Sequence, residues 1–273
     1  MSNGICLVAQ NNLKTNYVRQ AYALALSALA QNPRLNISLV TDDNIPTNYR
    51  SVFDKVIPIP WGDLALHSKW KVENRWKVYH TTPYENTIVL DVDMLILNDI
   101  GQTWTHSNTS NLLFTNRVKT YRDEIVSSRY YRKTFDANDL PDVYAGFYQF
   151  SKCDETLEFF KLLDIVMQNW ETFYAIYAPK NKQKWCSIDV SVAIALKILD
   201  KQGYTLNNSS LTFTHMKPYV QNLQNVQEKW TDMLSIDYGD GLYINGYKQT
   251  GVFHYVEDEF LTDSMLFWLE EKI

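Results

Sequence analysis

Along the first third of the chain, short apolar runs alternate with segments in which apolar residues recur at helical spacing. Ile5–Ala9 is a short apolar run that predicts a strand, and the polar turn Gln10-Asn11-Asn12 separates it from apolar positions at helical spacing between Leu13 and Ala28. Asn36–Val40 and Lys55–Ile59 are again short apolar runs that predict strands. This alternation is typical of an α/β fold, in which helices flank a central, mostly parallel sheet.

A helix is predicted between the third of these strands and the next one. The segment Lys69–His80 has aromatic residues at helical spacing, and Pro83 closes it. Its basic residues are Lys69, Lys71, Arg75 and Lys77. Four cations just before a carboxylate pair indicate a pyrophosphate site, and an exposed basic helix face is the alternative.

Two carboxylates interrupt an otherwise unbroken apolar run. Asp91 and Asp93 lie within Ile88–Leu97, and burying an ionised carboxylate is unfavourable unless a partner or cation compensates it. The run predicts a central strand, in which residues two apart point the same way. If the strand ends near Asp91, both carboxylates lie at the carboxyl edge of the sheet, where open α/β folds bind ligands. The pair therefore predicts a seat for Mg²⁺ or Mn²⁺ with a nucleotide, and a strand end that caps a helix or faces water is the alternative.

Three later segments carry candidate chemistry. Arg117–Lys133 holds six basic residues without a clear period, which indicates an acceptor-side or active-site loop, with solvated surface as the alternative. Asp142–Phe150 predicts a strand in which Gly146 allows a close approach of ligand or backbone. Ser187 is predicted to cap a helix whose first turn holds Asp189, where a carboxylate also complements the helix dipole.

The C-terminal part combines turn signals with histidines in apolar strands. Asp240-Gly241 and Asn245-Gly246 predict turns between short strands. His254 lies in the predicted strand Thr250–Val256, and His215 follows another at Leu211–Thr214. Such a histidine is commonly a core residue. Beside two carboxylates, either one can supply a third metal ligand, and imidazole suits Mn²⁺ better than Mg²⁺.

Composition and charge narrow the class of protein. A chain of 273 residues is expected to form one domain, and 31 Asp and Glu against 26 Lys and Arg argue against a general nucleic-acid binder. The three cysteines, Cys6, Cys153 and Cys186, are widely spaced, so they suggest no disulfide framework and fit a reducing compartment. The sequence shows no signal-peptide pattern and no long apolar stretch, so we expect a cytoplasmic protein without a membrane span.

Taken together, these residues resemble the GT-A glycosyltransferases of the glycogenin and bacterial lipopolysaccharide galactosyltransferase type. The resemblance follows chain order over most of the sequence, and its most specific part is the Asp-x-Asp strand. The matching stretches are Leu7–Asn12, Arg75 before a Pro-Tyr-Glu-Asn turn, Tyr84–Asp93, Ala145-Gly146 and His254-Tyr255.

The resemblance implies a fold, a reaction and a set of site residues. Residues 1–273 would form a single GT-A domain, with a nucleotide-binding half near 1–100 and an acceptor-side half near 101–273. The reaction would be metal-dependent transfer of a sugar from a nucleotide-diphosphate donor, expected to be a UDP-sugar, with retention of configuration. Asp91, Asp93 and His254 would hold Mn²⁺ or Mg²⁺, and Asp189 would be the catalytic carboxylate candidate that positions donor or acceptor. The implied donor contacts are Ala9, Gln10, Asn11, Asn12, Tyr17, Arg75, Val92, Ala145, Gly146 and Lys217.

Three departures from the family pattern bear on the site. Tyr144 stands where the family has an asparagine, and Ile188 stands where it has a glutamine. The family's Gly-x-x-Lys-Pro-Trp after the histidine is absent, and with it the lysine expected on the diphosphate. Lys217 or Lys248 can substitute for that lysine.

Two other functions stay open at this point. A sugar nucleotidyltransferase uses a similar sheet and metal but has a glycine-rich phosphate loop after its first strand, and the turn Gln10-Asn11-Asn12 has no glycine. A sugar- or nucleotide-binding module that keeps the fold without the chemistry is favoured by Tyr144 and Ile188. The acceptor, whether a saccharide, a lipid-linked sugar or a protein, is not identified by any local motif.

Overall fold

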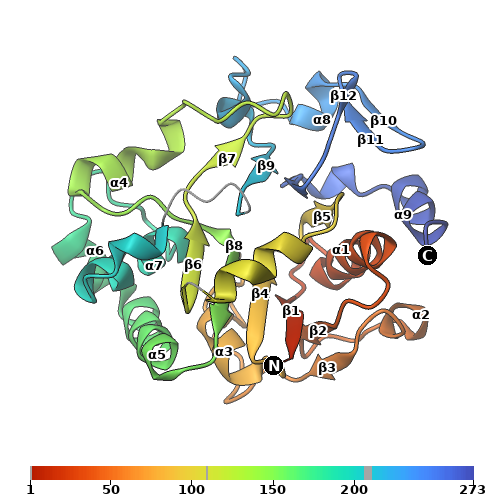
Figure 1. Ribbon diagram of the computed structural model, residues 1–273. Coiled ribbons are helices and arrows are strands. Elements are labelled where there is room, and N and C mark those ends of the chain that lie inside the picture. Colours follow the sequence, from red (N-terminus) through yellow and green to blue (C-terminus); the bar gives the residue numbers. More distant parts are fainter. Residues whose placement is uncertain (1, 109, 206–210) are drawn as a thin grey trace.

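The computed structural model describes residues 2–108, 110–205 and 211–273, and at its centre lies a six-stranded sheet with helices on both faces (Figure 1). The strand order is β3-β2-β1-β4-β8-β6. The strands are β1 Asn3–Val8, β2 Ile37–Val40, β3 Lys55–Ile57, β4 Asn86–Leu90, β6 Leu112–Thr115 and β8 Tyr144–Ser151. The predicted α/β class with a central, mostly parallel sheet is confirmed.

Strand β4 occupies the middle of this sheet because its whole length is apolar or uncharged. All five of its residues are buried. It runs parallel to β1 and antiparallel to β8, which in turn is antiparallel to β6. The remaining pairs, β1 with β2 and β2 with β3, are parallel. β4 therefore joins the parallel part of the sheet to its antiparallel edge.

Helix α1 (Tyr17–Gln31) covers one face of the sheet. The side chain of Asn16 accepts a hydrogen bond from the Arg19 N–H at 2.9 Å and so caps the first turn. Ile5 and Leu7 of β1 belong to the apolar cluster under α1, whereas Cys6 belongs to the cluster on the opposite face. This alternation is the side-chain period of a strand.

Three helices cover the other face of the sheet. They are α5 (Asp154–Gln168), α6 (Trp170–Tyr177) and α7 (Ile188–Ile198), and their buried side chains form one cluster with Val89 of β4. The predicted capping position of Ser187 before α7 is confirmed, although its side chain makes no capping hydrogen bond.

A second sheet, of order β5-β13-β9-β7, brings the C-terminal part of the chain to the end of β4. Its strands are β5 Met94–Ile96, β7 Val118–Lys119, β9 Phe213–His215 and β13 Val252–His254. β13 is antiparallel to β5 and parallel to β9. Because β5 begins only four residues after β4 ends, and β13 pairs with β5, the end of β13 lies beside the Asp91–Asp93 segment.

The C-terminal region adds an antiparallel meander and helix α9 (Asp263–Glu270). The meander consists of β10 Ile236–Tyr238, β11 Leu242–Ile244 and β12 Tyr247–Lys248. Asn245 and Gly246 connect the last two strands with φ values of 50° and 80°, as a two-residue Asn-Gly hairpin turn requires. Both predicted turns are therefore confirmed.

Several short helical segments complete the described chain. They are α2 Thr47–Arg50, α3 Val78–Thr81, α4 Lys133–Asn138, α8 Trp230–Met233 and the 3₁₀ turns Arg75–Lys77, Gly101–Asn108, Tyr130–Arg132, Gln202–Thr205, Pro218–Gln221 and Asp258–Phe260. No helix among the described residues combines the length and the apolar character needed to cross a bilayer.

The prediction of a helix over Lys69–His80 is wrong in its first half. Helical structure starts only at Arg75, and the residues before it form an irregular loop. Lys71 has a φ of 54°, which an α-helix excludes, and its ammonium donates hydrogen bonds to the carbonyls of Ala65 at 2.7 Å and Leu66 at 2.9 Å. These contacts within the loop outweigh the helical spacing of its aromatic residues.

Candidate functional site

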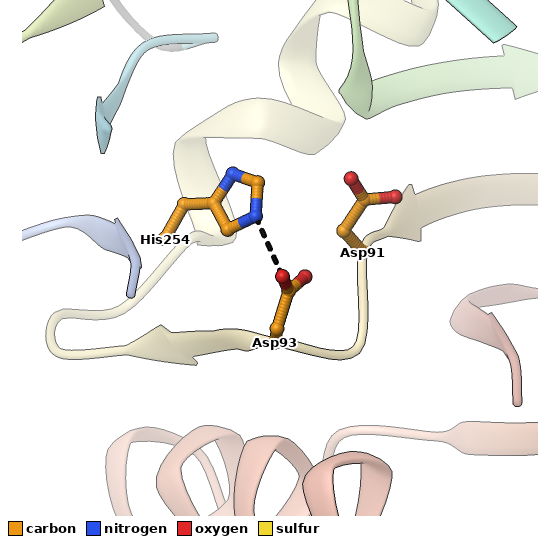
Figure 2. Close-up of side chains that lie close together, drawn as sticks. All are labelled: Asp91, Asp93 and His254. Carbon is orange, nitrogen blue, oxygen red and sulfur yellow. Dashed lines mark ion pairs between the residues drawn. The ribbon is translucent and has the colours of Figure 1, made fainter. Parts of the chain in front are cut away.

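Three side chains with metal-ligand chemistry converge at the carboxyl end of β4. The carboxylates of Asp91 and Asp93 and the imidazole of His254 each offer a ligand atom, and these atoms lie within 4.8 Å of one another. Figure 2 shows the three side chains gathered around one space, two from the segment after β4 and one from the end of β13. The predicted strand end near Asp91 is confirmed, since β4 ends at Leu90. The prediction of one strand through Ile88–Leu97 is wrong, because the chain turns at Asp91–Asp93 and continues as β5 in the second sheet.

Main-chain hydrogen bonds hold the three residues in place. The N–H of Asp91 donates to the carbonyl of Gly146 in β8 at 2.8 Å, and the carbonyl of Asp93 accepts from the N–H of Tyr255 at 3.1 Å. His254 pairs with Met94 in the antiparallel register of β13 and β5. Residues far apart in sequence are therefore fixed by the ladders of two sheets.

The charges of the cluster are partly compensated inside the protein. Burial opposes ionisation of Asp93, but His254, whose Nε2 lies 3.0 Å from Asp93 Oδ2, together with Arg75 holds the pKa of this carboxyl below its usual value. Arg75 forms an ion pair with Asp91. Burial disfavours the charge on Arg75, but the Asp91 carboxylate raises the pKa of the guanidinium above its ordinary value.

The donor set fits a divalent cation. Two carboxylates and one imidazole suit Mn²⁺, and Mg²⁺ takes the carboxylates more readily than the nitrogen. The buried Nδ1 of His254 has no hydrogen-bond partner among residues 2–108, 110–205 and 211–273, so the ring is not committed to a structural hydrogen bond through that atom. The only strong contact of its other nitrogen within this set is the Asp93 carboxylate.

A pocket of about 570 Å³ opens in front of the cluster. Nine of the residues predicted to bind donor or metal, or to act in catalysis, line it: Tyr17, Arg75, Asp91, Val92, Asp93, Gly146, Asp189, Lys217 and His254. Five others do not: Ala9, Gln10, Asn11, Asn12 and Ala145. The structure thus gathers residues from both predicted halves of the chain around one cavity.

The loop from Ala9 to Asn12 has contacts that shape the entry into α1. Asn11 Oδ1 accepts from the N–H of Val18 at 3.0 Å, and Asn12 Oδ1 accepts from the N–H of Thr15 at 2.8 Å. Gln10 Oε1 accepts from the Asn74 side chain at 2.7 Å. These side chains order the turn after β1, and their contact with a nucleotide stays a prediction.

Asp189 has a partner for each carboxylate oxygen. Oδ1 accepts from the N–H of Ala145 at 2.9 Å, and Oδ2 lies 3.2 Å from the guanidinium of Arg132. Arg132 is buried, donates to the carbonyl of Val143 at 2.6 Å and stacks 3.6 Å above the ring of Tyr144. This arrangement makes Asp189 the link between α7 and the start of β8, and its predicted catalytic role stays a prediction.

The sequence did not predict the contacts that Arg132 and His215 make. Arg132 lies in the basic segment that was expected to form a loop near the site, but nothing in that segment distinguishes it from five other cations. His215 lines the pocket because β9 pairs with β13 in the register that aligns it with His254, and the two rings lie 4.7 Å apart. The pairing of β9 with β13, which no local pattern encodes, creates the contact between the two histidines.

The structure separates the two lysines considered for the diphosphate. Lys217 lines the pocket, with its Nζ 5.0 Å from the centre of the Tyr131 ring. Lys248 lies in the meander and pairs with Asp240 at 3.1 Å. Within the described residues the Lys217 ammonium has no ion-pair partner, and burial lowers its pKa. Lys217 is therefore the lysine available to an anion in the pocket.

Comparison with known proteins identifies the fold. No protein-family model and no curated protein matches the sequence. Among solved structures, galactosyltransferase LgtC in complex with donor and acceptor sugar analogs matches with a TM-score of 0.52 and 14% identity, covering 98% of this chain and 93% of LgtC. Mouse xyloside xylosyltransferase 1 matches with a TM-score of 0.51 and 9% identity, covering 93% of this chain and 97% of that one.

A third match differs in length. Glycosyltransferase GlyE of Streptococcus pneumoniae TIGR4 matches with a TM-score of 0.51 and 13% identity over 100% of this chain, which spans 61% of GlyE. All of these proteins are GT-A glycosyltransferases. The chain therefore has the GT-A fold, as its resemblance to this family implied.

Proposed function

We propose that this chain is a metal-dependent glycosyltransferase that moves a sugar from a UDP-sugar to a hydroxyl acceptor with retention of configuration. The observation that carries the proposal is the convergence of Asp91, Asp93 and His254 at the strand ends of a GT-A fold, in one pocket with Arg75 and Lys217. This combination suits a nucleotide diphosphate, because the phosphates need both a cation and positively charged side chains.

The charges that line the pocket support a requirement for a divalent cation. The carboxylates are Asp91, Asp93, Asp189 and Asp258, and the side chains that can carry a positive charge, apart from the histidines, are Arg75, Arg132 and Lys217. With neutral histidines this set is net negative, which repels a diphosphate. Two positive charges at the Asp91–Asp93–His254 cluster make it net positive. Binding of the donor is therefore expected to depend on Mn²⁺, or less strongly on Mg²⁺.

In the proposed reaction an acceptor hydroxyl oxygen bonds to the anomeric carbon while that carbon's bond to the diphosphate oxygen breaks. The bonding electrons leave with the nucleoside diphosphate, and the hydroxyl proton is transferred to that leaving group. A divalent cation held by Asp91, Asp93 and His254 would neutralise charge on the diphosphate. Lys217 and Arg75 add positive charge on the protein side of the same group.

Gly146 and Asp189 shape the space for the sugar. A Cβ at Gly146 would lie 2.8 Å from Asp91 Oδ2, so the glycine lets the carboxylate approach β8. Asp189 fixes the guanidinium of Arg132 at the pocket wall. We assign Asp189 a positioning role for donor or acceptor, because both of its oxygens already have partners.

The remaining predictions belong to this proposal. Ala9, Gln10, Asn11, Asn12, Tyr17, Val92 and Ala145 would bind the nucleoside and sugar of the donor, and residues near 101–273 would supply most of the acceptor side. The acceptor is a saccharide, a lipid-linked sugar or a protein. A cytoplasmic location suits the use of soluble nucleotide sugars.

Calorimetric titration of UDP and of GDP, with and without Mn²⁺, tests the proposal. We expect UDP binding that needs Mn²⁺ and is lost in an Asp91→Asn/Asp93→Asn double variant. A matched variant, Asp237→Asn/Glu271→Gln, removes two exposed carboxylates outside the pocket and should bind as the wild type does. Absence of nucleotide binding under every metal condition would overturn the transferase proposal.

One further candidate function is favoured by the partners of Asp189. A module that binds nucleotide sugars without transferring them would keep the metal cluster, and it would tolerate Tyr144, Ile188 and an Asp189 that is engaged by Arg132 and Ala145. Release of sugar from a UDP-sugar in buffer separates the two, because a transferase commonly shows slow donor hydrolysis and a binding module shows none above background.

A further inference from the structure

The outer wall of the pocket carries two half-exposed tryptophans from different loops. Trp70 belongs to the irregular loop before Arg75, and Trp185 lies directly before the start of α7. Both line the pocket, yet 53% of Trp70 and 51% of Trp185 remain exposed. An indole left half in water at a cavity loses much of the hydrophobic gain that its burial would give.

Each of the two loops also adds an apolar side chain to the pocket. Val72, two residues after Trp70, and Ile188, three residues after Trp185, pack on the same buried cluster. Both also line the pocket. The two tryptophans therefore share the pocket lining with two apolar side chains that are anchored on one part of the core.

Packing of the fold does not account for either indole. Neither Trp70 nor Trp185 belongs to a buried cluster. Throughout the described part of the chain, neither indole N–H has a hydrogen-bond partner, and the contact of Trp70 is with its own neighbour Lys69, whose ammonium lies 4.5 Å from the ring centre. Tyr131, which lines the same pocket, differs because its ring packs on Tyr130 and Tyr219.

We propose that Trp70, Val72, Trp185 and Ile188 form an acceptor subsite that binds an apolar aglycone. This inference rests on the proposed function and names the class of its acceptor, which would be a glycoside or alcohol with an aliphatic or aryl group beside the reacting hydroxyl. The subsite is continuous with the donor half, because Arg75 and Asp189 follow the two tryptophans in sequence and line the same cavity. Ile188 contributes because its apolar side chain lines the pocket directly after Ser187.

Chemistry favours this class over a purely polar sugar. Four apolar side chains contribute to this wall, and a polar hydroxyl placed against their carbon surface would lose its hydrogen bonds to water without replacement. An alkyl or aryl group gains by leaving water, and flat indoles bury it at little cost in side-chain entropy.

Calorimetry with glycosides that differ only in aglycone tests the proposal. Methyl, octyl and phenyl β-D-glucopyranosides would be titrated in the presence of UDP and Mn²⁺, with the octyl compound below its micelle concentration. We expect the octyl or the phenyl compound to bind about tenfold or more tightly than the methyl compound. A preference for octyl assigns an aliphatic aglycone, and a preference for phenyl assigns an aryl one.

Matched tryptophan variants distinguish binding at the subsite from nonspecific hydrophobic binding. Trp70→Ala and Trp185→Ala should each bring the affinity for the preferred glycoside close to that of the methyl compound. Trp61→Ala removes an indole that is 66% exposed and outside the pocket, and it should leave the preference unchanged. Trp185→Phe keeps an apolar ring and should retain most of the preference.

The outcomes distinguish this proposal from the proposed function. UDP binding measured on the same samples reports the donor site and the fold. Intact UDP binding with equal affinities for all three glycosides, or an aglycone preference that survives both alanine variants, would overturn the subsite alone. Absence of UDP binding would overturn the transferase and the acceptor assignment with it.

Discussion

The two halves of the pocket are built in different ways. The half around Asp91, Asp93 and His254 is held by main-chain hydrogen bonds at the ends of β4, β5 and β13. The outer half comes from loops, in which Lys71 donates to main-chain carbonyls and the exposed Trp70 ring contacts the ammonium of its neighbour Lys69. The first half is therefore part of the hydrogen-bonded sheets, whereas the second half consists of loops outside them.

From this difference we infer which substitutions should affect donor binding and which should affect selectivity. Strand ends position a small set of ligands with little freedom, so changes there should affect binding of any donor. Loops on a rigid scaffold commonly set selectivity and tolerate change. The predictions below test this division, in order of expected effect.

Arg75→Met tests the strand-held half most severely. It leaves the Asp91 carboxylate beside Asp93 without its cation and removes a positive group from the pocket. A hydrogen bond to a charged group contributes about 1.5–3 kcal/mol, so we expect UDP affinity in Mn²⁺ to fall by about 10- to 100-fold. Calorimetry measures this loss. Arg34→Met, at an exposed arginine outside the pocket, is the control, and equal UDP affinity in both variants would remove Arg75 from the donor site.

The pair of Arg132 and Asp189 should affect stability more than donor binding. Asp189→Asn leaves a guanidinium that is 5% exposed without its counter-charge, which we expect to cost about 2 kcal/mol of the free energy of unfolding. Adding Arg132→Met should restore part of this loss, because no unpaired buried charge then remains. Urea unfolding of the single and double variants measures the coupling. A UDP affinity that falls as far as in Arg75→Met would show that Asp189 belongs to the donor half.

The strand-held half is also the half that the sequence predicts well. Asp91 and Asp93 interrupt an apolar run whose first half forms β4, so the sequence predicts a strand that brings both carboxylates to the edge of the sheet. The turn at Asp91–Asp93, and not the alternation of a continuous strand, sets the direction of the two side chains. His254 was predicted from a strand pattern, a histidine and the family resemblance together. In this half the apolar pattern and the cost of burying carboxylates both indicate a site at the end of a strand, so the edge of the sheet and its carboxylates could be predicted without the structure.

The loop-held half could not be predicted in the same way. The aromatic spacing of Lys69–His80 predicts a helix, but the bonds from Lys71 to Ala65 and Leu66 hold an irregular loop instead. Contacts between segments far apart in sequence leave no periodic signal, so Trp70 and Trp185 gave no sign of lying at one pocket. The same holds in the strand-held half for the contact between His215 and His254, which depends on the parallel register of β9 and β13.

Gly146→Ala tests how rigidly the strand-held half fixes the position of Asp91. Its Cβ would lie 2.8 Å from Asp91 Oδ2 and 3.0 Å from Met94 Cε, so Asp91 has to move away from the cluster. We expect the metal-dependent affinity for UDP to fall by about tenfold, or about 1.4 kcal/mol. Gly203→Ala adds a methyl group where no atom of residues 2–108, 110–205 and 211–273 lies within 4 Å, and it should change nothing. Wild-type affinity in Gly146→Ala would mean that the Asp91 position is adjustable and that the strand-held half is less rigid than we infer.

The smallest effect is expected from an ion pair outside both halves of the pocket. The hydrogen bond from Lys201 is the largest cause that lowers the pKa of Glu155 from 4.5 to about 2, so in the folded protein the carboxylate is favoured. The stability that it contributes is present above pH 4.5 and is lost as the pH falls toward 2. Both side chains are more than a third exposed, so Glu155→Gln should lower the free energy of unfolding by less than about 1 kcal/mol at pH 7. Urea unfolding should show this difference at pH 7 and a smaller one at pH 3, with UDP binding unchanged. A difference that grows on acidification would mean that the ion pair does not form in solution, and a loss of UDP binding would mean that the pocket is not isolated from the α5 surface.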